Sequence, residues 1–276
     1  MTRHRQDLIL AFRHAIINFM NRKRINQTIF WALSLLVVLS MALGLVISVM
    51  PRPRLPTPTP LLFSFAVCGE SPDNASICSQ LLRQIAEDDS VFLIHTGNLV
   101  PMGSKSNFQE FAKLTVDFLL PFYPVPGNHD YYQGTLDNFL RYSGAPDAHY
   151  SFNHGPVHLA LSNSGQGDMN SEELDWLRAD LKSSEQPLKM VFLHYPPFTP
   201  GGRGEAMRSG SGKFMALMEE QRVDYVFAGH IRGYHTEERN GMRYIFTSGG
   251  DPHHYVHVTV QGTEVTVGMV HLEGSQ

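Results

Sequence analysis

Cysteine is scarce in this chain, and so are tryptophan and an excess of charge of either sign. Two cysteines among 276 residues are too few for a disulfide scaffold or a zinc–thiolate site. A formal net charge of −4, with 17% charged residues, gives no basic face of the kind that binds nucleic acid. Cys68 and Cys78 leave two possibilities open, which are a disulfide in an oxidising compartment or two buried thiols.

Charge is absent altogether from residues 29–50, IFWALSLLVVLSMALGLVISVM. We expect an uncharged apolar run of this length to cross the roughly 30 Å hydrocarbon core of a bilayer as a helix. Basic side chains are more numerous before the run than after it, which puts the N-terminus in the cytoplasm and the rest of the chain outside. They are Arg3, Arg5, Arg13, Arg22, Lys23 and Arg24 before it, and Arg52 and Arg54 after it. The alternative, a cleaved signal peptide, normally has a shorter apolar region and a small-residue cleavage site.

Composition divides the rest of the chain. Residues 1–28 form a basic cytoplasmic segment, and residues 51–60, PRPRLPTPTP, form a linker. Five prolines in those ten residues disfavour helix and predict a stiff, extended spacer. With 42% hydrophobic and 11% aromatic residues overall, the chain has ample material for a buried core, which we place in one globular domain at residues 61–276.

Within this domain, short apolar runs alternate with helical patterns. Strands are predicted at residues 61–67, 90–97, 150–152, 157–161, 190–194 and 224–229, and helices at residues 77–86, 108–120, 136–142, 171–184 and 213–221. Ser171 is the predicted N-cap of the fourth helix. From residue 234 onward the pattern favours antiparallel strands with a turn at Asn240 and Gly241. The alternation and the β-rich end predict an α/β domain with two sheets packed between helices.

Polar side chains follow several of these strands at the point where each strand ends. The carboxyl ends of strands in α/β sheets meet at one edge, where ligands bind. Glycine lets the backbone turn sharply there, so that the next side chain projects into the site. Five such segments occur in order along the domain, at residues 69–70, 97–98, 127–130, 194 and 229–232.

The order and spacing of these segments resemble the calcineurin-like metallophosphoesterase superfamily, which includes the purple acid phosphatases. The resemblance covers nearly all of residues 61–276, and its most specific part is the GNHD sequence at residues 127–130. It implies a four-layer αββα sandwich of two mixed sheets. It also implies two divalent metals that flank a water nucleophile and clamp the oxygens of a displacement at phosphorus.

The resemblance assigns Asn128, His194 and His230 to the second metal. It places His129 near the leaving group, with Asp130 as the acidic neighbour that orients it. Asn98 stands where the family has a bridging aspartate and completes a set of two imidazoles and two amide oxygens. A single Zn, Fe or Mn ion suits such a set. We therefore expect at most one divalent metal, or none.

The first metal site is predicted to be degenerate. Glu70, Pro72, Asn98 and Arg232 stand where the resemblance would put its ligands. Proline offers no side-chain donor, and a guanidinium about 5 Å from a dication at an effective dielectric of 20 is repelled by about 7 kcal/mol. We expect Arg232 to occupy the vacated position and pair with Glu70. The alternative is that both side chains face solvent.

Two functions follow from this half-retained site. The first is a membrane-anchored phosphoesterase acting on phosphate esters outside the cytoplasm, with Arg232 and His129 at the substrate. The second is an impaired relative that keeps the fold to bind an anion or a protein partner, because function resides in the site and not in the fold. The expected partners are a phosphate-containing small molecule and, through one helix, a lipid bilayer; nucleic acid is not expected.

Overall fold

The computed structural model describes residues 27, 29–41, 61–70, 75–202, 205–247 and 253–273. The chain divides into two compact units, residues 1–58 and 59–276, which are described separately. In the first unit, residues 29–41 are helical, whereas residues 42–50 of the predicted membrane segment, the linker at 51–60 and residues 1–26 lie outside the described residues. No helix within the described residues is both long enough and apolar enough to cross a membrane.

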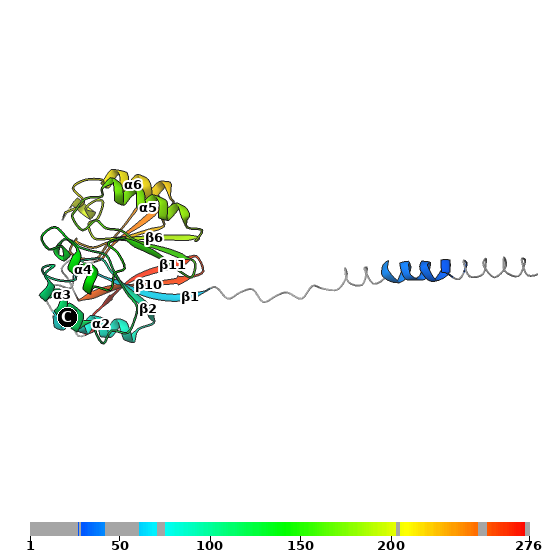
Figure 1. Ribbon diagram of the computed structural model, residues 1–276, viewed down its shortest axis with the longest axis horizontal. Helices are drawn as coiled ribbons and strands as arrows, with labels where there is room; N and C mark the ends of the chain where they lie inside the picture. Colours follow the sequence, from blue (N-terminus) through cyan, green and yellow to red (C-terminus); the bar gives the residue numbers. More distant parts are fainter. Residues whose placement is uncertain are drawn as a thin grey trace, which may run out of the picture. The chain divides into compact units, whose positions relative to one another are not determined.

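The second unit is built on two mixed β-sheets (Figure 1). The first sheet has the strand order β11 (Glu264–His271), β10 (His254–Gln261), β1 (Leu62–Cys68), β2 (Ser90–His95) and β3 (Phe122–Pro124). The second has the order β4 (Tyr150–His154), β5 (Val157–Leu161), β6 (Leu188–Leu193), β7 (Tyr225–Ala228), β9 (Met242–Phe246) and β8 (His235–Arg239). In the first sheet β1, β2 and β3 run parallel, and β10 and β11 are added on the β1 side, each antiparallel to the strand before it in that order. In the second sheet β5, β6, β7 and β9 run parallel, and the antiparallel strands β4 and β8 form the two edges.

Aromatic and aliphatic side chains fill the space between the sheets. Phe65 of β1 meets Phe192 of β6 edge to face, with 6.4 Å between ring centroids, and Phe192 stacks on Phe227 at 4.8 Å. Each of these side chains is fully buried. Alternate residues of each strand point into this layer, because successive side chains of a strand face opposite sides.

Helices cover the outer face of each sheet, which gives the predicted order of helix, sheet, sheet and helix. Helix α2 (Ala75–Glu87) packs Leu81, Leu82 and Ile85 on the first sheet, while α5 (Ser171–Ser183) and α6 (Ser211–Glu220) cover the second (Figure 1). Helices α3 (Lys105–Leu114) and α4 (Asp137–Tyr142) contribute a smaller cluster beside the first sheet. Cys68 and Cys78 are both buried in the α2 layer, and no disulfide joins them in the described part of the chain.

Most predicted elements occur within a few residues of their expected positions, including the β8–β9 hairpin with its turn at Asn240 and Gly241. The predicted N-cap Ser171 is wrong, because the preceding Asn170 accepts the Glu173 N–H at 2.8 Å. Helix α3 ends at Leu114 and not at 120, and Thr115 is its C-cap, whose hydroxyl donates to the Phe111 carbonyl at 3.1 Å. Strand β3 had no matching prediction.

Candidate metal centre

The five polar segments that follow the strands meet at one edge of the sandwich. Glu70 follows β1, Asn98 follows β2, and the short helix η1 (Asn128–Asp130) follows β3. His194 and His230 follow β6 and β7 of the other sheet. A hydrogen bond of 2.8 Å between His194 Nδ1 and the Thr96 carbonyl joins the two halves. The site is therefore shared by both sheets, as parallel strands ending at a common edge lead us to expect.

Two glycines let these segments approach one another closely. A Cβ atom at Gly97, which has φ of +96°, would lie 2.7 Å from His194 Nδ1. A Cβ atom at Gly127 would lie 2.2 Å from Asn98 Oδ1. Any larger residue at either position would therefore displace a side chain of the site.

Three of the site residues adopt a left-handed backbone conformation although none is glycine. The φ angles are 58° at Glu70, 59° at Asn98 and 64° at His230. Such a conformation costs a non-glycine residue about 1 kcal/mol or more, and it persists where the surrounding structure fixes it. Three of the six non-glycine residues with positive φ in the described part of the chain therefore lie at the site, and strained residues are common at functional positions.

His194 presents a free lone pair to the site. It is fully buried, and its burial, together with the nearby His230, lowers its pKa to about 3, so the imidazole is neutral. Because Nδ1 donates its proton to Thr96, Nε2 is unprotonated. Nε2 lies 2.9 Å from Asn128 Oδ1, 3.2 Å from His230 Nδ1 and 3.8 Å from Glu70 Oε1.

The backbone fixes which atom of each amide faces this cluster. The His129 N–H donates to Asn98 Oδ1 at 2.9 Å, so Asn98 must turn its Nδ2 toward Glu70 Oε1, 2.8 Å away, and Asn128 Oδ1, 3.3 Å away. Asn128 consequently directs an oxygen at His194. Asn98 Oδ1 accepts the His129 N–H, and the Nδ2 that faces the cluster has no lone pair to give, so the ligand role of Asn98 stays a prediction.

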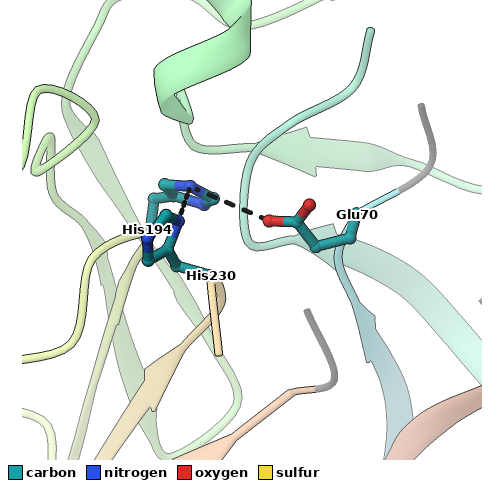
Figure 2. Close-up of side chains that lie close together, drawn as sticks. All are labelled: Glu70, His194 and His230. Carbon is teal, nitrogen blue, oxygen red and sulfur yellow. Dashed lines mark hydrogen bonds and ion pairs between the residues drawn. The ribbon is translucent and has the colours of Figure 1, made fainter. Parts of the chain in front are cut away.

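The resulting cluster suits a divalent cation. Ligand atoms of Glu70, His194 and His230 all lie within 4.8 Å of one another, and Figure 2 shows the Glu70 carboxylate directed at the two imidazoles. Asn128 Oδ1 adds a fourth acceptor. Lone pairs that face one another repel unless a cation or proton lies between them. Two imidazoles, a carboxylate and an amide oxygen form a set that Zn, Fe or Mn accepts.

His129 and Asp130 differ in their surroundings. His129 is exposed, and its Nδ1 lies 2.9 Å from the Pro101 carbonyl. Asp130 is fully buried, and its two oxygens accept the backbone N–H groups of Asn98, Leu99, Val100 and Gly127. Burial raises the pKa of Asp130 to about 7, while these four hydrogen bonds oppose the rise. The prediction that Asp130 orients the His129 imidazole is wrong, because the carboxylate holds the two site loops together instead.

Arg232 lies outside the cluster. Its side chain is exposed and lines a cavity of about 780 Å³ together with Pro200, Gly201, Glu205, His230, Ile231 and His235. In the described part of the chain no ion pair joins Arg232 to Glu70, so the predicted pairing in the vacated metal position is wrong. Glu70 instead accepts from Asn98 and approaches His194. Pro72 lies outside the described residues.

Sequence reasoning missed two contributors to the site. The Thr96 carbonyl fixes the tautomer of His194, and a backbone acceptor has no sequence signal beyond its place at the end of β2. Glu205 Oε2 lies 3.8 Å from His230 Nε2 on the opposite side of that ring from the cluster. Its loop had no periodic pattern that could have placed it there.

Comparison with known proteins gives concordant results. The profile of the calcineurin-like phosphoesterase family matches residues 63–234. Purple acid phosphatase 22 of Arabidopsis thaliana is 31% identical over 120 residues, which are 41% of this chain and 26% of that protein. The 3',5'-cyclic adenosine monophosphate phosphodiesterase CpdA of Escherichia coli K12 is 25% identical over 163 residues, 56% of this chain and 59% of that enzyme. The chain thus spans less than two thirds of either relative.

One solved structure has a similar fold. GAP50, the anchor in the inner membrane complex of Plasmodium, superposes with a TM-score of 0.61 at 13% identity, over 78% of this chain and 86% of that one. At this identity the match concerns the fold alone.

Proposed function

The chain belongs to the calcineurin-like phosphoesterase family, and we propose that it is a phosphoric ester hydrolase that works with a single divalent metal. The observation that carries the proposal is the convergence of Asn128 Oδ1, His194 Nε2, His230 Nδ1 and Glu70 Oε1 on one point beside the exposed His129. When bound, a divalent cation supplies Lewis-acid polarisation of a phosphoryl oxygen and activation of water for attack at phosphorus.

His129 is the residue we assign to proton transfer. Its Nδ1 is held by the Pro101 carbonyl, and its backbone N–H is held by Asn98, so the imidazole has a fixed position at the edge of the cluster. Nε2 would donate a proton to the departing ester oxygen from the imidazolium form, in which both ring nitrogens carry a proton. An imidazole is suited to this step because its ordinary pKa lies near neutrality.

Arg232 is the residue we assign to substrate binding. It carries a permanent positive charge in the cavity that His230 also lines. A planar guanidinium can hold two oxygens of a phosphate at once. The volume of about 780 Å³ is enough for the organic group of an ester of nucleotide size. A phosphodiester, the substrate class named for CpdA, fits these features.

One observation favours a second function, an anion-binding relative without turnover. Asn98 directs an amide nitrogen into the site where a carboxylate would bridge two metals. A centre without that bridge is a weaker activator of water, and phosphate could be bound without being transferred.

Membrane attachment belongs to the same proposal. Residues 29–50 contain no charged side chain, and basic residues cluster before them. This distribution supports a cytoplasmic N-terminus and a catalytic domain outside. In sealed right-side-out vesicles, added protease should digest the domain. Protection of the domain in such vesicles would contradict that orientation.

The activity is tested on the full-length chain purified in detergent and loaded with Mn²⁺ or Zn²⁺. Aryl phosphate monoesters and diesters serve as substrates, and release of the phenol is measured. His194→Ala and His230→Ala are expected to abolish turnover, whereas His257→Ala, on β10 and paired with Asp89, is the matched control and should leave it unchanged. A protein that binds metal and phosphate but turns over neither ester would establish the second function instead.

A further inference from the structure

Glu70 brings a carboxylate to the two histidines. Its Oε1 lies 3.8 Å from His194 Nε2, and it shares the 4.8 Å cluster with His230 (Figure 2). Two ligands bound at about 2.1 Å to one tetrahedral cation lie about 3.4 Å apart. The separation of Glu70 from His194 is already close to that value, so the remaining gap is within reach of side-chain rotation.

Asn98 fixes the Glu70 carboxylate in this position. Asn98 is 2% exposed, and its own oxygen is held by the His129 N–H, so its amide cannot flip. Its Nδ2 donates to Glu70 Oε1 at 2.8 Å. A carboxylate oxygen has more than one lone pair, so Oε1 can accept this bond and still coordinate a cation. Such an outer hydrogen bond is how proteins commonly orient a metal-bound side chain.

The same amide opposes a second cation. A bridging carboxylate lies between the two ions of a dinuclear centre and offsets their mutual repulsion. At position 98 the group that faces Glu70 and Asn128 is an N–H donor, whose hydrogens carry partial positive charge. A second dication beside Asn98 would therefore meet a repulsive group and would lack the anion that joins it to the first.

We infer that this cluster holds one divalent cation, with Glu70 as its anionic ligand and Asn98 as the positioning residue of Glu70. The other ligands are Asn128 Oδ1, His194 Nε2 and His230 Nδ1. The inference rests on the proposed function for its chemistry, and it names a carboxylate that sequence comparison would place at the other, degenerate site. A single carboxylate leaves the divalent centre with surplus positive charge, which attracts an anionic phosphate.

The experiment measures metal binding without turnover. The full-length protein is stripped with a chelator and titrated with Mn²⁺, while stoichiometry is followed by calorimetry and the bound ion by electron paramagnetic resonance. We expect one Mn²⁺ per chain with the spectrum of an isolated ion. Loss of an outer hydrogen bond to a ligand weakens metal binding by about 10–100-fold, so Asn98→Ala should fall in that range. Glu70→Gln, which removes a ligand charge at constant shape, should weaken binding by at least about 100-fold. Glu110→Gln, exposed on α3, is the matched control and should bind as the wild type does.

The outcomes separate this inference from the proposed function. Two Mn²⁺ ions per chain with a spin-coupled spectrum would overturn the inference and leave hydrolysis in place. Glu70→Gln that binds Mn²⁺ as tightly as Glu110→Gln would also overturn it. One Mn²⁺ bound through Glu70 in a protein that hydrolyses no ester would support the inference and refute the proposed function. Thermal unfolding in chelator, where Glu70→Gln should match the wild type, shows that the variant is folded.

Discussion

Replacing Asn98 by aspartate is the sharpest test of the hydrogen-bond arrangement at the site. The variant restores the carboxylate that the family resemblance puts at this position. One of its oxygens would still accept the His129 N–H, while the other would lie where Nδ2 now sits, 2.8 Å from Glu70 Oε1. A favourable hydrogen bond would thereby become a contact between two carboxylates.

The loss of stability expected for Asn98→Asp can be bounded from the 2.8 Å separation of the two oxygens. Two unit charges 2.8 Å apart at an effective dielectric of 20 repel by about 6 kcal/mol. Uptake of a proton by the pair limits the penalty, because protonating a carboxyl group of ordinary pKa at pH 7 costs about 4 kcal/mol. We therefore expect Asn98→Asp to lose about 4 kcal/mol of stability at pH 7 without metal, which lowers the melting temperature by roughly 10 °C in a domain of this size.

The pH dependence has a definite sign. The shared proton raises the folded-state pKa of the pair above its unfolded value of about 4, so the penalty is absent below pH 4 and grows as the pH rises toward the folded pKa. A divalent cation should restore stability, since it lies between the two carboxylates. Thermal unfolding in chelator at pH 4 to 8, with and without Mn²⁺, measures both effects.

Asn138→Asp is the matched control, because Asn138 also donates a hydrogen bond, to the Gly103 carbonyl at 2.9 Å, but contacts no carboxylate there. Its stability should change by about 1 kcal/mol or less and should not respond to Mn²⁺. An Asn98→Asp protein that melts with the wild type at pH 7 in chelator would refute the orientation assigned to Asn98 and, with it, the placement of Glu70.

Three further predictions concern other parts of the domain. Arg232→Ala should raise KM for an aryl phosphodiester by about 10-fold or more while leaving the Mn²⁺ affinity unchanged, since Arg232 lies outside the metal cluster; an unchanged KM would remove it from substrate binding. Asp130→Asn should cost about 3 kcal/mol in urea unfolding, because an amide nitrogen would face backbone N–H donors; wild-type stability would contradict this role. Cys68 and Cys78 should resist a thiol reagent in the native protein, since burial raises the pKa of Cys68, and rapid labelling would disprove their burial.

The strands and the residues that follow them could be predicted because both signals are local. A run of apolar residues followed by glycine and a polar side chain indicates where a strand ends. The parallel arrangement of the strands then brings Asn128, His194 and His230 together. The same reasoning failed at residues 115–120, where Val116 and Leu119 continue an apolar pattern but are 69% and 91% exposed. Periodicity alone does not reveal that Thr115 ends the helix.

The roles of the charged residues could not be predicted, because each depends on directions that the sequence does not contain. Asp130 follows His129 directly, yet its carboxylate turns to four backbone N–H groups on the other side of the loop. The predicted pairing of Glu70 with Arg232 rests on their places in the family motifs and on their opposite charges. In the fold, the left-handed backbone at Glu70 directs its carboxylate toward Asn98 and His194 instead.

The correction at Glu70 has its physical origin in the side chain at position 98. With an aspartate there, a carboxylate at position 70 would be repelled unless a cation neutralised the pair. With asparagine, the amide attracts the same carboxylate and holds it against the histidines. The asparagine removes one negative charge from the centre. Its amide also holds the Glu70 carboxylate beside the histidines, where that carboxylate could bind one cation. In the proposed one-metal site, Glu70 and Asn98 form a coupled pair, and the effects of substituting them should be non-additive.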